Sequence, residues 1–227
     1  MSTRRVVITG LGAVTPLANT VSETWDGIIN GKSGISSIDS FDISPFTTTF
    51  GGVIRNFDIS EYIPAKDAKR MDGFIHYGIA PGCQAIEDSG IEVTEENAER
   101  IGVAIGAGIG GVTGIEECYA TYDKSGPRRI SPFFVPGNII NMISGNLSIK
   151  YGLKGPNFAI VTACTTGTHN IGDASRLIKY GDADVMVAGG AERCTTSPTA
   201  MGGFASARAL SRRNDDPQAA SRPWDKD

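Results

Sequence analysis

The sequence has no long apolar segment: no stretch approaches the roughly 20 consecutive apolar residues of a membrane helix. The short apolar run near the N-terminus is broken by Gly10 and Gly12, so it lacks the continuous apolar core of a signal peptide. We therefore expect a cytoplasmic protein with no membrane partner.

Cysteine and histidine are also scarce, with four and two copies. No Cys-x-x-Cys pair occurs among the cysteines, which are Cys83, Cys118, Cys164 and Cys194. This spacing excludes the usual zinc and redox-pair motifs, so we expect reduced thiols and no metal site.

Charge of one sign is not in large excess. The net charge of −4 over 227 residues argues against nucleic acid as a partner. Apolar residues make up 40% and charged residues 20%, which is typical of a soluble globular protein. Glycine is abundant, with 29 copies that cluster beside apolar runs, where tight strand-to-helix turns need it.

Four short apolar runs predict strands, at residues 6–8, 101–105, 158–161 and 184–188. None of them alternates polar and apolar residues, which favours strands that are buried on both faces, as in a parallel sheet. A weaker strand is expected at residues 52–55.

Helical spacing of apolar residues lies between these runs, at residues 72–89, 112–122 and 164–180. Gly181 is a plausible stop for the last of these helices. Strands that alternate with helices predict an α/β fold, with a mostly parallel central sheet and helices on both faces. Residues 123–138 read as a long structured loop, and no linker is evident, so we expect one domain over residues 1–227.

The strongest local signal is a strand end, a cysteine and then a helical pattern: Val161-Thr162-Ala163-Cys164-Thr165-Thr166-Gly167-Thr168-His169. A thiol at a helix N-terminus is favoured as the thiolate, and the N–H groups there can bind an oxyanion. Cys164 is therefore a candidate nucleophile. The alternative is an inert buried cysteine, which is a common fate of free thiols.

The segment from Thr162 to Gly172 resembles the active-site segment of the β-ketoacyl-[acyl-carrier-protein] synthases, and is closest to their type II class. Segments along nearly the whole chain are similar as well, at residues 5–12, 128–136, 182–192 and 204–225. The resemblance implies a thiolase-like fold, a homodimer and an acyl carrier protein as partner.

In this family a fatty acyl group passes from the phosphopantetheine of the carrier to the cysteine. Malonyl-carrier then loses CO2, and the resulting carbanion attacks the thioester. The resemblance gives Cys164 the role of nucleophile and of backbone oxyanion donor. It implies no cofactor beyond the substrates' phosphopantetheine.

The family also needs two further histidines, a lysine and a glycine-rich loop from its C-terminal half. His169 lies five residues after Cys164, about 140° round a helix, and we interpret it and His76 as structural. The chain stops at Asp227 without a closing element, so we expect an N-terminal half whose C-terminal half is missing. Alone, these 227 residues are expected to be inactive in condensation.

Gly106, Gly108 and Gly111 formally satisfy the dinucleotide-binding pattern Gly-x-Gly-x-x-Gly. No second strand with an acidic end follows about 20 residues on, so a tight turn is the better interpretation. The resemblance makes three residues candidates for the acyl pocket, with plain core packing as the alternative: Ile109, Phe134 and Phe204.

Six basic residues are candidates for binding the acidic carrier protein: Lys66, Lys69, Arg70, Arg128, Arg129 and Arg208. The alternative is an ordinary solvated charged face.

Proteins with other functions have similar sequences and are the alternatives to this interpretation. A type I synthase would differ in chain-length preference, but Cys164-Thr165-Thr166-Gly167 favours type II. A thiolase would act on CoA esters, and the basic residues, which suit an acidic carrier protein, argue against that function. A non-catalytic dimer partner would typically have replaced the cysteine, and an inactive truncated fragment is the remaining alternative.

Overall fold

A computed structural model describes residues 4–226, which form two compact units. The first, here called the sheet unit, contains the chain up to Ala13 and Asp58–Arg193. The second, here called the hairpin unit, contains Val14–Phe57 and the chain from Cys194 onward. Over residues 4–226, no helix combines the length and apolarity that crossing a bilayer requires.

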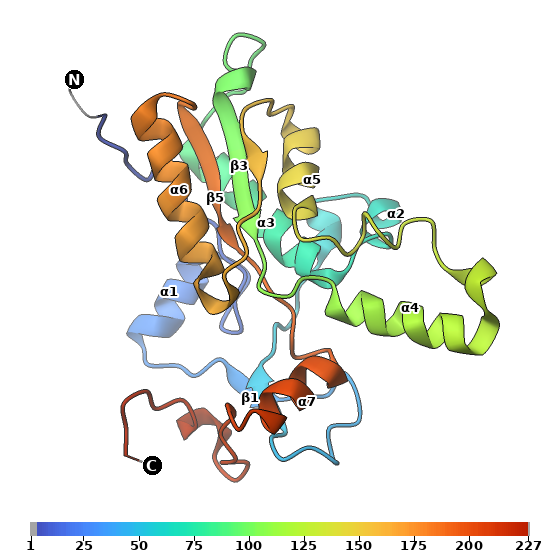
Figure 1. The fold of residues 1–227 in the computed structure, drawn as a ribbon. Coiled ribbons are helices and arrows are strands. Elements are labelled where there is room, and N and C mark those ends of the chain that lie inside the picture. Colours follow the sequence, from blue (N-terminus) through green and yellow to red (C-terminus); the bar gives the residue numbers. More distant parts are fainter. Residues whose placement is uncertain (1–3, 227) are drawn as a thin grey trace. The chain divides into compact units, whose positions relative to one another are not determined.

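The sheet unit carries three parallel strands in the order β4-β3-β5 (Figure 1). Its strands are β3 (Ile101–Gly106), β4 (Asn157–Phe158) and β5 (Val185–Gly190). Its helices are α2 (Ala65–Ala68), α3 (Gly73–Ser89), α4 (Val112–Ser125), α5 (Met142–Tyr151) and α6 (Thr166–Tyr180). Short 3₁₀ turns lie at η1 (Ile59–Glu61), η2 (Ala98–Arg100), η3 (Pro127–Arg129) and η4 (Ala163–Thr165).

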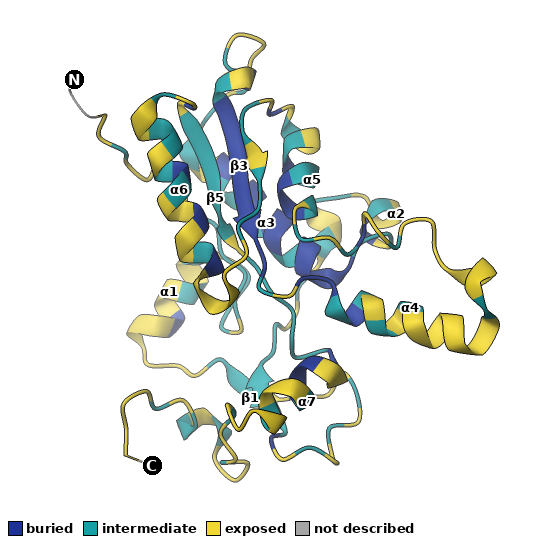
Figure 2. Cartoon of the chain, in the orientation of Figure 1, coloured by how far each residue is buried: buried dark blue, intermediate teal, exposed yellow. Residues whose placement is uncertain are grey.

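Helices cover both faces of this sheet. Helices α3 and α5 pack on one face and α6 packs on the other, against β5 and β3 (Figure 1). Strand β3 is buried along its whole length, as Figure 2 shows in dark blue. This arrangement confirms the predicted α/β class with a parallel central sheet.

The predicted helices at residues 72–89 and 164–180 are confirmed as α3 and α6. Each ends at a glycine in the left-handed region, Gly90 with φ 65° and Gly181 with φ 90°. The helix predicted at residues 112–122 is also present as α4, but it continues to Ser125, so the long loop begins three residues later than expected.

The strand predicted at residues 6–8 is wrong. Residues 6–8 pair with no strand of the sheet β4-β3-β5, and the residues that follow them, 10–13, lie against α3. Side chains of α3 accept hydrogen bonds from backbone N–H groups of this segment. Asp88 accepts from the N–H of Leu11 at 2.9 Å, and Gln84 accepts from the N–H of Ala13 at 2.9 Å. Gly12 permits this approach, because a side chain there would overlap the backbone of α3.

Two other strand predictions had the wrong bounds. In the run at residues 158–161, Phe158 alone belongs to a strand. Beyond it the backbone hydrogen-bonds to the side chain of Asn170 instead of to a neighbouring strand. The weak strand expected at residues 52–55 is β2, which ends at Gly52.

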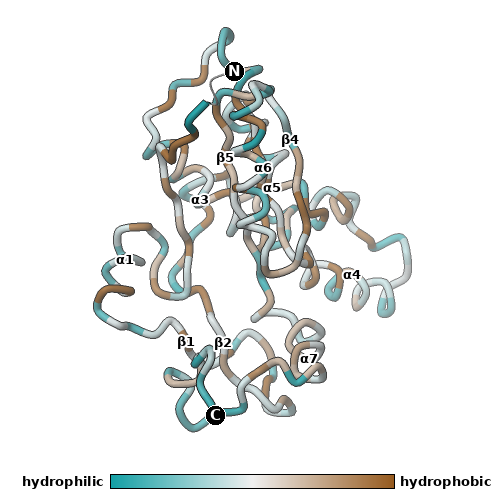
Figure 3. The backbone as a smooth tube through the Cα atoms, turned by 60° about the vertical axis from the view of Figure 1, so that its left-hand side comes forward, coloured by the Kyte–Doolittle hydropathy of each residue, from teal (hydrophilic) through white to brown (hydrophobic). Residues whose placement is uncertain are grey.

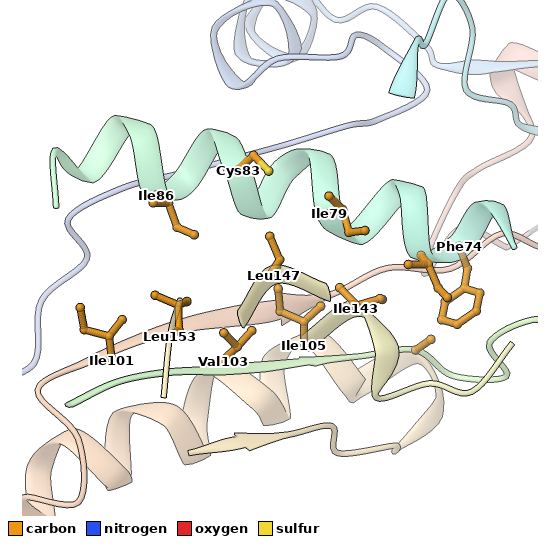
Figure 4. Packing of buried hydrophobic residues seen from close by; sticks show 12 residues of the cluster. Phe74, Ile79, Cys83, Ile86, Ile101, Val103, Ile105, Ile143, Leu147 and Leu153 are labelled. Atoms are coloured by element: carbon orange, nitrogen blue, oxygen red, sulfur yellow. The ribbon is translucent and has the colours of Figure 1, made fainter. Parts of the chain in front are cut away.

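The hydrophobic core of the sheet unit lies between α3, α5 and β3 (Figure 4). Ile79 and Ile86 of α3 point toward α5 and β3, and the side chains of β3 lie below Leu147 of α5 in this view. Each fully buried aliphatic side chain of this kind contributes about 1.5–3 kcal/mol. Gly78 and Gly82 let the two helices approach, because Ile143 and Leu147 occupy the space where their Cβ atoms would be.

One buried carboxylate caps two helices. Asp72 is the N-cap of α3, where Oδ1 accepts from the N–H of Phe74 at 3.0 Å. Its Oδ2 accepts from the N–H of Gly114, in the first turn of α4, at 2.7 Å. The backbone N–H of Asp72 donates to the carbonyl of Gly137, which also ties this point to the loop after α4.

The hairpin unit contains α1 (Val21–Ile29), α7 (Pro198–Ser206), the 3₁₀ turn η5 (Pro217–Ala219) and the antiparallel pair β1 (Ile35–Ser37) and β2 (Phe50–Gly52). The side chain of Asn214 bonds to Thr47 and Thr49, which holds the segment after α7 against the chain before β2.

We expect Gly78→Ala to destabilise the protein although alanine is the better helix former. The new methyl group would lie 2.5–2.9 Å from three atoms of Ile143, which is overpacking that costs about 1–3 kcal/mol. The matched control is Gly172→Ala on α6, where nothing would lie within 4 Å of the new methyl group. It should stabilise by up to about 1 kcal/mol. Urea midpoints measure both, and equal shifts in the two variants would contradict the packing argument.

Candidate functional site

Cys164 lies in the 3₁₀ turn η4, between the end of β4 and the start of α6. Of the four cysteines, Cys164 is the exposed one, whereas Cys83 is buried. Burial raises the pKa of the Cys83 thiol, so that group stays protonated and shielded. Exposure and the order strand, turn, helix together distinguish Cys164 as the thiol that a substrate can reach.

The backbone immediately before the thiol is strained. Ala163 has φ 53°, in the left-handed region that residues other than glycine rarely adopt. This conformation costs roughly 1–2 kcal/mol and persists where surrounding contacts enforce it. The turn that presents Cys164 is therefore held in place by its surroundings.

Side chains from η4 and from the first turn of α6 supply part of that restraint. The hydroxyl of Thr166 accepts from the N–H of Thr162 at 2.9 Å. The hydroxyl of Thr165 donates to the carbonyl of Thr162 at 2.7 Å. Thr162 is thus fixed on both its backbone groups just before the strained Ala163.

Asn170 of α6 clamps the strand-like segment that precedes the turn. It is fully buried, accepts from the N–H of Ile160 at 3.1 Å and donates to the carbonyl of Ile160 at 3.1 Å. Sequence motifs assigned no role to this residue. Its signal was a polar side chain on the buried face of α6, four residues after Thr166 and four before Ala174.

Ser144 of α5 likewise bonds to backbone groups, in this case those of β3 and β4. Its hydroxyl is fully buried, accepts from the N–H of Ile105 at 2.9 Å and lies 2.9 Å from the carbonyl of Phe158. The pairing of these strands is therefore continued by a side chain at the end nearest the turn with Cys164.

The glycine-rich segment at residues 107–111 connects β3 to α4 and lies beside the turn with Cys164. Gly110 has φ 86°, and a Cβ placed at Gly108 would be 3.5 Å from Ala163. The carboxylate of Glu192 accepts from the N–H groups of Ile109 at 2.7 Å and Gly110 at 3.2 Å. A protein carboxylate thus occupies the N–H groups that a nucleotide phosphate would need, which agrees with the turn interpretation.

The three candidate pocket residues come from different places. Ile109 is half exposed, within the segment next to Ala163. Phe134 is half buried, and its carbonyl accepts from Asn138, whose own carbonyl accepts from the N–H of Gly111. The loops of Ile109 and Phe134 are therefore linked, whereas Phe204 lies on α7 in the hairpin unit.

The candidate basic residues also come from several elements. Lys66 on α2 and Lys69 after it are exposed, as are Arg128 and Arg129 in η3. Arg70 binds Asp67 at 3.3 Å and stacks over the ring of Phe133 at 4.3 Å, which joins α2 to the loop after α4. The last, Arg208, is exposed at the end of α7 with φ 56°.

Both histidines have structural contacts. His76 Nε2 lies 3.0 Å from the carbonyl of Ala68, and burial lowers the pKa of its ring. His169 lies 3.3 Å from the hydroxyl of Thr162 and 3.8 Å from Asp173. Among residues 4–226, no three His, Cys, Asp or Glu side chains gather where they could hold a metal ion.

Comparison with known proteins gives one family. The family model described as "Beta-ketoacyl synthase, N-terminal domain" matches residues 3–227. The chain is 60% identical over 227 residues to 3-oxoacyl-[acyl-carrier-protein] synthase 2 of Vibrio cholerae and 59% identical over 226 residues to that of Vibrio harveyi. It covers 55% and 54% of these two proteins, so it spans about half the length of the curated relatives it matches.

Solved structures are similar as well. A β-ketoacyl synthase from Burkholderia phymatum superposes with a TM-score of 0.86 at 29% identity, over 98% of this chain and 54% of that one. A type II PKS acyl-carrier protein in complex with its ketosynthase gives a TM-score of 0.79 at 25% identity, over 92% of this chain and 58% of that one. These likenesses confirm the predicted thiolase-like fold of the ketosynthases.

We expect Ala163→Gly to stabilise the fold by up to about 1 kcal/mol, because glycine adopts the left-handed region without the steric cost. Ala120→Gly, on the exposed face of α4, is the control and should destabilise by about 1 kcal/mol. Thermal denaturation of both variants tests this. A loss of stability in Ala163→Gly equal to that of the control would mean that residue 163 is not strained.

Proposed function

The chain belongs to the β-ketoacyl synthase family, and we propose that it is the N-terminal domain of a type II 3-oxoacyl-[acyl-carrier-protein] synthase that elongates fatty acids. The observation that carries this proposal is Cys164, exposed on a strained turn at the start of α6. It stands in a chain that is 60% identical over its whole length to a synthase of this kind.

In the first proposed step, the thiolate of Cys164 attacks the thioester carbonyl of an acyl group carried on the phosphopantetheine of an acyl carrier protein. A bond forms between Sγ and the carbonyl carbon, and the phosphopantetheine sulfur leaves and takes up a proton. Splitting a difficult transfer through a protein thioester is ordinary covalent catalysis. The oxyanion that forms would accept a hydrogen bond from the backbone N–H of Cys164.

In the second proposed step, a malonyl group on the carrier protein loses CO2. The electron pair of the broken C–C bond attacks the acyl carbonyl on Cys164, and the cysteine thiolate is released with a ketoacyl product two carbons longer. His76 and His169 are engaged in the structural contacts described above. We therefore assign acyl transfer to this chain and decarboxylation to residues outside it.

We expect one acyl group to be added to the protein by an acyl-pantetheine thioester, measured by intact mass. Cys164→Ser should abolish this addition, whereas Cys118→Ser, a change at a less exposed thiol, should retain it. Addition to Cys164→Ser would exclude Cys164 as the nucleophile. The proposed function itself would be contradicted if no acyl group were added either to this chain or to the full polypeptide, meaning the longer synthase of which the chain is proposed to be the N-terminal domain.

We also propose an acidic acyl carrier protein as partner, bound by the six basic residues named above. Five of them are exposed or partly exposed on the sheet unit. The sixth, Arg208, adopts a left-handed conformation at the end of α7, where glycine is the usual residue. Strained residues of this kind cluster at binding sites, which supports a role of the Arg208 side chain in binding.

We expect Arg208→Gly to raise the thermal stability slightly and to weaken carrier-protein binding several-fold at low salt. The control is Arg212→Gly, whose backbone lies outside the left-handed region. It should lower stability and leave binding nearly unchanged. Thermal denaturation measures the stability of the two variants, and titration calorimetry with acyl carrier protein measures their binding. Unchanged binding in Arg208→Gly would remove this residue from the interface.

A homodimer is part of the proposal. Helix α4 is largely exposed, as the yellow ribbon in Figure 2 shows. Among its exposed residues are Ile115, Tyr119 and Tyr122, which recur at helical spacing. Figure 3 shows apolar positions among hydrophilic ones along this helix. A second copy of the chain would cover such a face. A cytoplasmic location, no nucleic-acid partner and no cofactor of its own remain predictions of the same proposal.

A further inference from the structure

Glu192 lies two residues beyond the end of β5 and reaches across to the segment that follows β3. Its Oε2 accepts from the N–H of Ile109 at 2.7 Å, and its Oε1 accepts from the N–H of Gly110 at 3.2 Å. Each carboxylate oxygen thus has its own backbone donor, in two successive residues. Successive N–H groups that converge on an anion form a concave binding site, which here is filled by the protein's own carboxylate.

The glycine-rich segment fits closely around this carboxylate. A Cβ at Gly108 would be 2.9 Å from Oε2, so the backbone of the segment passes close to the carboxylate at this residue. The N–H of Ala191 donates to the carbonyl of Gly106 at 3.0 Å, which continues the pairing of β5 with β3 to the residue just before Glu192. The backbone of Glu192 is therefore fixed on the sheet, and its side chain transmits that position to residues 107–111.

The same segment borders the turn that carries the thiol. Gly108 lies close to Ala163, the residue before Cys164, and Ile109 follows with half of its surface exposed. The position of the Ile109 side chain next to this turn depends on where its backbone is held. Glu192 provides that hold without needing to reach the reacting atoms.

We propose that Glu192 is a positioning residue that fixes the segment 107–111 and, through Ile109, sets which acyl chain lengths are accepted at Cys164. This inference rests on the proposed function and extends it to acyl-chain selectivity. A charged acceptor suits the role, because it binds two neutral N–H donors more strongly than an amide oxygen would. Misplacement of such a segment by about 1 Å can change rates by up to about 100-fold.

The test compares Glu192→Gln with wild type in the full polypeptide. The amide group has one acceptor oxygen, so at least one of the two N–H bonds should be lost. Hydrogen exchange of a peptide covering residues 107–111 should speed up about tenfold, with a core peptide of α3 unchanged. The ratio of acyl-transfer rates for long and short acyl-pantetheine thioesters should change at least about fivefold.

Two further variants separate positioning from general loss of structure. Glu95→Gln, an exposed change far along the sequence, should leave exchange and the ratio as in wild type. In an Ile109→Ala background, Glu192→Gln should alter the ratio much less, because the effect passes through that side chain. A merely structural role would slow all chain lengths equally and would persist in this background.

The outcomes are distinct. If wild type takes up acyl groups and Glu192→Gln leaves the ratio unchanged, the positioning role is overturned and the proposed function stands. If the ratio changes equally with and without Ile109, the role assigned to Ile109 is overturned. If the wild-type full polypeptide takes up no acyl group at Cys164, the proposed function fails, and the inference built on it fails with it.

Discussion

The site depends on one constraint: backbone N–H and C=O groups that the parallel strands leave unpaired at one end of the sheet still need hydrogen-bond partners. At this end of the sheet, side chains supply them. Ser144 serves Ile105, Asn170 serves Ile160, and Glu192 serves the segment after β3. These residues come from α5, from α6 and from beyond β5, so three separate parts of the chain converge where the strands stop.

The same hydrogen bonds explain how the strained turn can persist. The left-handed conformation of Ala163 costs roughly 1–2 kcal/mol, whereas a typical net hydrogen bond contributes about 1 kcal/mol. Thr162 and Ile160 together accept or donate four such bonds to side chains of η4 and α6. Their sum exceeds the cost, and the helix that follows the thiol therefore also determines how the thiol is presented.

Much of the fold could be predicted from the sequence, and much of the support around the site could not. Helices α3 and α6 and strands β3 and β5 follow from apolar periodicity, which side-chain burial imposes directly. The run at residues 6–8 has the same apolar character, but its Val7 and Ile8 side chains are exposed and it forms no strand, so apolar character alone does not determine strand pairing. Cys164 was identifiable from its motif. Asn170 and Glu192 were not, because bonds from side chain to backbone leave no periodic pattern.

The position of the Asp72 carboxylate has a consequence for local unfolding of α3 and α4. Asp72 is itself the N-cap residue of α3, so separating α4 from α3 would leave that cap in place but would remove the partner of the N–H of Gly114 in the first turn of α4. The exposed helix is therefore not an independent appendage. Fraying of the first turn of α3 would displace the Asp72 carboxylate and so uncap the base of α4, which makes the order of this exposed helix depend on the order of the core helix.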